Sequence, residues 1–521
     1  MKKMGHVLFG LTSLVFGFAY SVAMNLLAAD MVKLSLLPVL VAGLLFLVLL
    51  YAVFFAVKLL KSGGDAVCTV KVAGKLPAAV WAFLLLTAVY TLCYLAYFPG
   101  PAVNDSLMIY SNGMMMARNS PVLYCLFISV FSKLGQLLGN HQLGVALCNV
   151  FQMLLVCAMS AWIVGWVYGK QLPRPIKVLV LLNFLLNPLL IIYSFTMIKD
   201  TVFSVGLVVL FLISYDIIIE NKASFVQWCI MALDILLILS FRNGVNYMLV
   251  VYLVLLVFAV KNKAVLKKAL VIILACLVST QLACSALEKR FDIEYYSKEM
   301  LAIPIQQLSA VVSADGELTE EQEKVISGMM PLDDIKAKYT PYNVDAIKWD
   351  IIFNDRYVNE NLPDILKVWL ELFPKNAATY TKAYLWETFW FWAPIQQGNV
   401  KIFETVMDLE PAWHEMTGIA DAPLLPEGIT GALKSYCGLG QHFLREGVLF
   451  WCMLFFLLES YALSGDWRIF IVYSLCLLQW AVLMVSTPVF HSIRYVLCYV
   501  YGLPVYVAML FLVKNPGQKI I

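Results

Sequence analysis

Long runs of apolar residues, separated by short polar segments, make up most of this chain. A helix needs about 20 consecutive apolar residues to cross a bilayer, and many of the runs reach that length. The pattern therefore predicts an all-α polytopic membrane protein. The predicted spans, about twelve in all, are residues 7–29, 34–60, 77–98, 141–168, 176–197, 201–219, 224–241, 243–260, 266–286, 446–463, 468–486 and 492–513.

A further apolar stretch, residues 121–138, fits this pattern poorly. It is short, serines interrupt it, and Lys133 lies near its end. A short segment that carries a charge lies more favourably at the membrane surface than across the hydrocarbon. We therefore expect an interfacial or re-entrant helix on the outer face.

The positions of Lys and Arg in the short loops predict the orientation, because cytoplasmic loops carry an excess of these residues. The clearest cluster of lysines lies within 261–268, which places that loop in the cytoplasm. Counting spans onward puts the polar block 287–444 outside and the C-terminus, near Lys514, inside. Counting from Lys2 gives the same sides only if 121–138 does not cross. We therefore expect a plasma-membrane protein with both termini cytoplasmic and its large domain extracytoplasmic.

The amino-acid composition agrees with this arrangement and limits the classes of partner that the protein can have. The chain is 62% hydrophobic and 14% charged, with a mean hydropathy of +0.81, which excludes an ordinary soluble protein. The net charge of +3 conceals a net −11 in residues 287–444, where 24 Asp and Glu outnumber 13 Lys and Arg. An acidic block between helices with basic loops indicates two faces of a lipid bilayer and no nucleic-acid partner.

The same changes in composition predict four parts. They are 1–76, two additional N-terminal helices with a cytoplasmic loop; 77–286, a transmembrane core with an outer loop at 99–140; 287–444, a mostly helical extracytoplasmic domain; and 445–521, the C-terminal helices.

Several familiar signatures are missing from the sequence. It contains no Walker loop, no GxGxxG motif and no His/Cys cluster with the spacing of metal ligands. Only five His are present, which argues against a His-ligated zinc centre. Of the twelve Cys, nearly all lie in apolar runs, and Cys437 alone lies clearly in the polar block, so no disulfide framework is predicted.

Asp105 is the first candidate for chemistry. It follows the third apolar run, in an outer loop that begins Pro99-Gly100-Pro101 and continues to Asn104. Membrane proteins seldom place an ionisable residue where a helix meets the bilayer surface without using it. We expect Asp105 to be a catalytic acid or base, or a metal anchor.

Asp200 supplies a second carboxylate at the same predicted level. It follows Lys199 at the outer end of the span 201–219. Two carboxylates at one membrane level can divide the work of proton transfer and of positioning a metal or a phosphate. The alternative is that Asp200 only begins a helix, where its charge favours the N-terminal dipole.

Basic residues form the second candidate group. Arg242 lies at an outer junction between two spans, Arg494 begins the last span close to His491, and Arg118 lies in the first outer loop. Arginine suits bidentate contact with phosphate. The alternative is that each arginine pairs with an acid for structure or extends to lipid headgroups.

Aromatic residues cluster between Tyr380 and Pro394, around Trp386, Glu387 and Trp390. Dense Trp and Tyr are typical of the belt at a membrane surface, and composition favours this interpretation. The same flat apolar rings can also stack against sugar rings.

These features together resemble the glycosyltransferase type C superfamily, polytopic enzymes that use polyprenyl-phosphate-linked sugars, and in particular its mannosyl- and aminoarabinosyl-transferase-like members. The chain also resembles a group of uncharacterised bacterial membrane proteins, in which we expect the segments Arg242-Asn243-Gly244, Ile303–Gln307 and Trp386–Pro394. The resemblance rests on the outer acid in Asn104-Asp105, the Pro-headed helix from Ser120-Pro121 to Lys133-Leu134-Gly135, the Asn187-Pro188 span followed by Lys199-Asp200, and the large outer domain before the final spans.

The resemblance implies a membrane glycosyltransferase of the cell envelope. It would move a sugar from a polyprenyl-phosphate donor to an extracytoplasmic glycan, lipid or protein. A divalent cation such as Mg²⁺ or Mn²⁺ at Asp105 and a metal-independent reaction are equally compatible with it. The alternatives are a transporter or flippase of lipid-linked sugars and a non-catalytic assembly subunit. The expected roles are catalysis by Asp105 and Asp200; binding of the donor phosphate by Lys199, Arg242 and Arg494; and acceptor or sugar contacts by Asn104, Arg118, Trp386, Glu387, Trp390 and His491.

Overall fold

The fold is built from helices, because apolar segments in a bilayer must satisfy their backbone hydrogen bonds internally. The structure, a computed structural model, describes residues 3–62, 75–400, 418–486, 489 and 491–513. These residues contain no strand, and two isolated bridges join Ala102 to Met197 and Asn343 to Val489. The expectation for a C-terminus near Lys514 falls outside the described residues.

Eight of the described helices are long and apolar enough to cross a membrane, which confirms a membrane protein with multiple spans. They are α1 (Lys3–Ala29), α2 (Leu36–Ser62), α3 (Lys75–Ala96), α6 (His141–Tyr168), α9 (Lys199–Ile218), α12 (Lys263–Phe291), α22 (Glu446–Ser464) and α25 (Leu497–Leu512), the last preceded by the 3₁₀ turn η5 (Ile493–Val496).

The other predicted spans are helices, but they are shorter or broken. The span that contains Asn187-Pro188 is bent by 50° between α7 and α8, because Pro188 cannot continue the helix and the Asn187 side chain caps the new one at the Leu189 amide. The total of twelve spans therefore stays a prediction. The helices concerned are α7 (Arg174–Leu186), α8 (Pro188–Ser194), α10 (Phe225–Phe241), α11 (Val245–Ala259), α23 (Ile469–Val472) and α24 (Ser474–Ser486).

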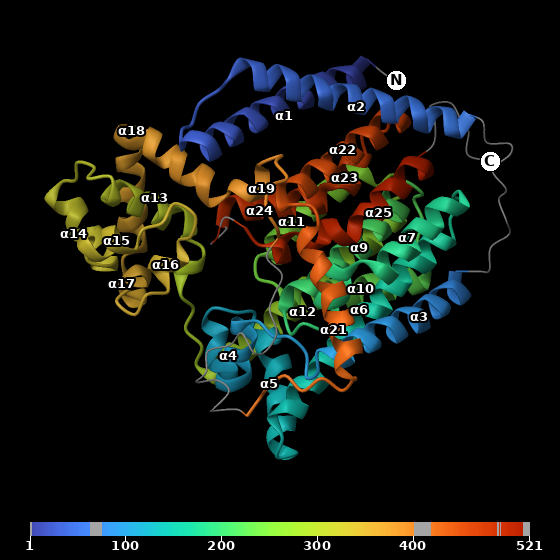
Figure 1. The fold of residues 1–521 in the computed structure, drawn as a ribbon, viewed down its shortest axis with the longest axis horizontal. Helices are drawn as coiled ribbons and strands as arrows, with labels where there is room; N and C mark the ends of the chain where they lie inside the picture. Colours follow the sequence, from blue (N-terminus) through green and yellow to red (C-terminus); the bar gives the residue numbers. More distant parts are fainter. Residues whose placement is uncertain (1–2, 63–74, 401–417, 487–488, 490, 514–521) are drawn as a thin grey trace.

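The outer loop after α3 folds into a unit of three short elements. They are α4 (Asn104–Asn112), the 3₁₀ helix η1 (Gly113–Arg118) and α5 (Val122–Leu137). The buried positions of α5, among them Cys125, Ile128 and Ser132, recur every three or four residues, so one face packs on the protein. Figure 1 shows α5 running crosswise to α3 at the edge of the bundle, the direction expected of a helix that lies along a membrane surface.

The polar block folds mainly as a separate helical unit with a hydrophobic core of its own, which includes Ile305, Ile326 and Ile365. Figure 1 shows α13 to α17 lying to one side of the bundle. The helix α21, by contrast, packs against α3 and α8. The elements of the block are η2 (Ser297–Glu299), α13 (Ala302–Ser313), α14 (Glu320–Met329), α15 (Leu332–Lys338), α16 (Asp345–Lys348), α17 (Asp355–Glu360), α18 (Leu362–Glu387), α19 (Phe389–Trp392), α21 (Glu427–Gly438) and η4 (Leu439–His442).

The two N-terminal helices form a hairpin whose backbones approach closely. Small residues permit this approach, since a Cβ at Gly17 would collide with the carbonyl oxygen of Val39, and one at Gly43 would lie 2.8 Å from the Ser13 oxygen. At the end of α1, Asp30 accepts hydrogen bonds from Lys382 (2.6 Å) and from the Trp386 indole (2.7 Å). The hairpin therefore holds α18 of the outer domain.

Replacing Gly17 with Leu is expected to destabilise the protein by roughly 1–3 kcal/mol, because the added side chain must push α1 and α2 apart. The matched control is Gly10→Leu on the same helix, where a Cβ meets no atom within 4 Å. Both variants are heated to a series of temperatures. Size-exclusion chromatography of the heated samples then gives the midpoint temperature of unfolding of each variant. Equal midpoints for the two variants would contradict the packing argument.

Candidate functional site

A cavity of about 990 Å³ lies where the ends of several bundle helices meet the polar block 287–444, which we call the outer domain after the side predicted for it. Its lining includes all five residues for which the sequence predicted catalytic or phosphate-binding roles: Asp105 from α4, Lys199 and Asp200 from α9, Arg242 at the end of α10, and Arg494 from η5. These side chains come from segments far apart in the chain, so the tertiary fold brings them together.

Asp200 is the buried centre of this group. Its side chain has no solvent exposure, and it forms an ion pair with Arg242. The Arg494 guanidinium lies 4.0 Å from the second carboxylate oxygen. Arg242 takes this position because α10 ends there and Gly244, with φ of 83°, turns the chain directly into α11. A carboxylate buried in this way requires cationic partners.

Asp105 is joined to the same group through Arg494. The distance between the Arg494 guanidinium and the Asp105 carboxylate is 3.5 Å, and 48% of the Asp105 side chain is exposed. Although burial acts to raise its pKa, the charges of Arg494 and Lys199 hold the pKa of Asp105 below its ordinary value. Asp105 is therefore a carboxylate at neutral pH, and Arg494 bridges the two predicted catalytic acids.

This lowered pKa predicts how stability depends on pH. An acid whose pKa is lower in the folded state stabilises the fold above its ordinary pKa of about 3.9, and this contribution disappears as the pH falls through the folded pKa. The difference in thermal stability between wild type and Asp105→Asn should be constant from pH 7 to about 5 and should shrink below about 4. Thermal unfolding across that pH range measures it. A difference that shrinks above pH 5 would contradict the assignment.

Tyr495 was not among the predicted residues, and it organises both arginines. Its ring centroid lies 4.8 Å from the Arg494 guanidinium carbon and 5.3 Å from that of Arg242. Arg494 also donates a hydrogen bond to the Tyr495 hydroxyl at 2.8 Å. The aromatic face and the hydroxyl together hold the two cations in fixed directions. In the sequence, only its position next to Arg494 indicates that Tyr495 belongs to the site.

Arg118 also lines the cavity, as a contact from the first outer loop. It donates a hydrogen bond of 3.1 Å to the hydroxyl of Tyr296, in the outer domain. Three further lining residues of that domain, Glu299, Asp345 and Trp349, carried no sequence signal. They lie in short polar segments that resemble any solvated surface.

The aromatic cluster around Trp386 lies apart from the cavity. Trp386, Glu387 and Trp390 do not line the cavity. Trp386 donates to Asp30 of α1, and Trp390 packs under the Arg445 guanidinium at 3.9 Å from its ring centroid. Glu387 is fully buried near the Val344 amide. These side chains join the outer domain to the bundle, so they are not placed to contact a ligand in the cavity.

Asn104 and His491 are likewise absent from the cavity lining. Asn104 is the first residue of α4 and is exposed, next to Asp105 in the chain. His491 lies in the segment that leads into η5. Their expected role as sugar or acceptor contacts stays a prediction.

The cavity has an apolar part as well as a charged part. Membrane helices contribute apolar side chains to it, including Val251 from α11, Leu277 from α12 and Val482 from α24. Much of α12 is exposed on the side of the bundle, since Leu274 and Val278 are each more than half exposed. A molecule with a charged head and a hydrocarbon chain matches this lining.

The arrangement of ligating atoms does not fit a divalent cation. Asp105 and Asp200 are paired with arginines. Within the described residues, no three His, Cys, Asp or Glu side chains gather as metal ligands. We therefore derive no step through a metal.

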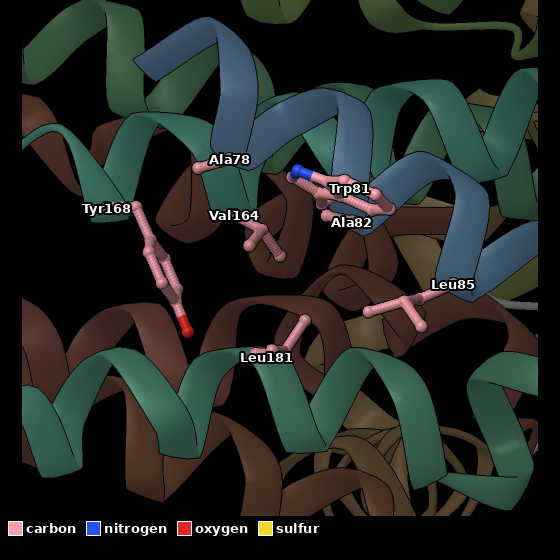
Figure 2. A pocket seen from close by; sticks show the side chains of 7 residues that line it. All are labelled: Ala78, Trp81, Ala82, Leu85, Val164, Tyr168 and Leu181. Atoms are coloured by element: carbon pink, nitrogen blue, oxygen red, sulfur yellow. The ribbon is translucent and has the colours of Figure 1, made fainter. Parts of the chain in front are cut away.

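A second pocket, of about 200 Å³, differs in character (Figure 2). Trp81 and Leu85 of α3, Tyr168 of α6 and Leu181 of α7 contribute to its lining, which includes no charged side chain. Trp81 is 67% exposed. Such a surface suits contact with lipid chains but carries no catalytic group.

The chain matches a known protein family. Residues 108–518 match a family described as a family of unknown function, DUF6020. The match covers well over half of the chain, so the protein belongs to this family. The matched region includes Asp200, Arg242 and Arg494 and begins just after Asp105, within α4. No curated protein and no solved structure matches the chain.

Proposed function

We propose that this protein is a membrane glycosyltransferase of the type C kind, which moves a sugar from a polyprenyl-phosphate donor to an extracytoplasmic acceptor. The observation that carries the proposal is one cavity whose lining joins Asp105 and Asp200, the three cations Lys199, Arg242 and Arg494, and an apolar wall. The charged part suits a phosphate and an acceptor hydroxyl, and the apolar part suits a prenyl chain.

The charges around the two acids leave room for an anion. Lys199, Arg242 and Arg494 are three cations beside the two carboxylates Asp105 and Asp200. Among the described residues, Lys199 makes no ion pair, although its charge acts on Asp105. Around Asp200, a donor phosphate would therefore meet three cations and two carboxylates, and a guanidinium that keeps one N–H on Asp200 has other N–H donors for the phosphate.

In the proposed reaction, Asp105 accepts the proton of an acceptor hydroxyl. The oxygen then bonds to the anomeric carbon of the donor sugar, and the bond between that carbon and the phosphate oxygen breaks. Arg494 and Arg242 stabilise the negative charge that grows on the departing phosphate. Asp200 holds the two arginines in place, so its part is to position them.

The proposal includes a topology for the plasma membrane. The eight long helices, the bent pair α7–α8, the helices α10 and α11, and the pair α23–α24 make twelve spans. With α5 at the outer surface, both termini are cytoplasmic and the outer domain faces the cell envelope.

A specific observation favours one rival function, transport of a lipid-linked sugar. The break at Asn187 resembles the broken helices of transporters. In transporters such breaks usually occur in two related halves, and the described residues contain one bent pair that passes as a broken span.

Purified protein in lipid nanodiscs tests the choice. The assay supplies radiolabelled polyprenyl-phosphate sugars with an extract of envelope glycans, lipids and proteins as acceptors, and it measures label transferred to each. Transfer that requires intact protein supports the enzyme. Movement of labelled lipid across liposome membranes without any transfer would instead support the transporter.

A further inference from the structure

The outer domain contributes its own wall to the cavity, and that wall has a different chemistry from the arginine group. It consists of Glu299 from η2, Asp345 from the start of α16 and Trp349 just after that helix. We call these three residues the outer wall. None of them is needed to hold the donor phosphate.

A buried lysine fixes the two carboxylates of the outer wall. The Lys348 side chain has no solvent exposure, and its ammonium lies 2.8 Å from Glu299 and 3.1 Å from Asp345. Each carboxylate keeps about a third of its side chain exposed. Lys348 neutralises one of the two negative charges, and the pair keeps acceptor oxygens that suit the hydroxyls of a neutral ligand.

Part of the Trp349 side chain contacts Lys298, and another part is exposed. The Lys298 ammonium lies 4.1 Å from its ring centroid, and Lys298 itself is fixed by hydrogen bonds to the Lys348 carbonyl (3.1 Å) and to Asp355 (3.0 Å). The indole nevertheless remains 47% exposed while it lines the cavity. A large aromatic side chain that is fixed but uncovered is a ready contact surface.

We propose that the outer wall is a carbohydrate subsite, in which a neutral sugar ring stacks on Trp349 and donates hydrogen bonds from its hydroxyls to Asp345 and Glu299. Both parts of the chemistry are needed for such a ligand: an apolar flat face for the C–H groups of the ring, and paired acceptors for its hydroxyls. Lys348 contacts one oxygen of each carboxylate, so a purely apolar lipid would give the remaining oxygens no hydrogen-bond donor, and a cation would compete with Lys348.

The location of this subsite identifies the class of acceptor. Asp105 from α4 and Asp345 from α16 line the same cavity. A sugar held by the outer wall is thus beside the proposed base. This inference rests on the proposed function for the role of the bound sugar: the acceptor is a glycan or glycolipid, and the outer wall binds its terminal sugar.

Saturation-transfer NMR on full-length protein in nanodiscs tests the subsite. The probes are D-glucose, D-galactose, D-mannose and N-acetyl-D-glucosamine as methyl glycosides, together with farnesyl phosphate for the arginine side. At least one glycoside should bind, and Trp349→Ala should weaken that binding roughly tenfold, as expected for loss of one central aromatic contact. Trp467→Ala is the matched control, because Trp467 is similarly exposed at 51% but lies outside the cavity lining.

The two proposals fail in different ways in this experiment. Retained farnesyl phosphate binding by Trp349→Ala shows that the variant is folded, and Asp345→Asn provides a second, smaller change that should also weaken glycoside binding. Absence of glycoside binding, or equal binding by the Trp349 and Trp467 variants, overturns the subsite. Glycoside binding without any sugar transfer by the wild type would leave the subsite standing and overturn the enzyme.

Discussion

Replacing Asp105 with Asn is expected to lower the rate of sugar transfer by roughly 100- to 10,000-fold, the usual contribution of a general base. The amide keeps the size of the side chain but cannot accept the proton of the acceptor hydroxyl. The rate of label transfer from the polyprenyl-phosphate sugar in nanodiscs measures the effect. Because the side chain is half exposed, the variant should fold normally.

The matched control for this change is Asp315→Asn. Asp315 is an exposed acid of the outer domain that pairs with Lys336, far from the cavity lining. Its replacement also exchanges one carboxylate for an amide, and transfer should stay at the wild-type rate. Near-normal transfer by a folded Asp105→Asn variant would remove Asp105 from the role of base.

Replacing Arg242 with Met is expected to destabilise the protein by about 3–5 kcal/mol, because Asp200 loses its direct partner while it remains fully buried. Arg494 compensates only in part, since its guanidinium lies 4.0 Å from Asp200. Thermal unfolding in nanodiscs measures the loss. Binding of farnesyl phosphate should also weaken, because one of the proposed phosphate contacts is gone.

A double variant separates these two effects. Asp200→Asn combined with Arg242→Met removes the buried charge together with its partner, so much of the lost stability should return. Farnesyl phosphate binding should not return, because the cation is still missing. If the double variant regains both properties, Arg242 serves the fold alone. If Arg242→Met alone is as stable as wild type, the ion pair between Asp200 and Arg242 does not stabilise the fold.

The helical class and the candidate acids could be predicted because of the bilayer itself. Apolar runs near 20 residues must be helices, and residues such as Asp105 and Asp200 stand out because charge is costly at a helix end in a membrane. Helix ends on the same side of a bilayer lie at the same depth. The acidic residues at those ends could therefore be expected to lie near one another. Loop charges likewise predicted that 121–138 lies along the surface.

The contacts of the aromatic segment could not be predicted from the sequence. Trp386 and Trp390 have the composition of a sugar platform or a membrane belt, yet their neighbours are Asp30 and Arg445. Those partners lie far away in the chain, so no local pattern could reveal them. Trp349, by contrast, sits alone in an ordinary polar segment, and its exposure within the cavity depends on how the outer domain packs.

By itself, the sequence determined that this is a helical membrane protein, and it singled out Asp105, Asp200, Arg242 and Arg494 as candidates for chemistry. Hydrophobic length and the cost of buried charge act locally, so they are readable from the chain. Only the tertiary structure decided that Arg494 lies between the two acids and that the outer domain closes the cavity with Trp349. These contacts join segments that lie far apart in the chain. They depend on how side chains pack, which no local pattern encodes.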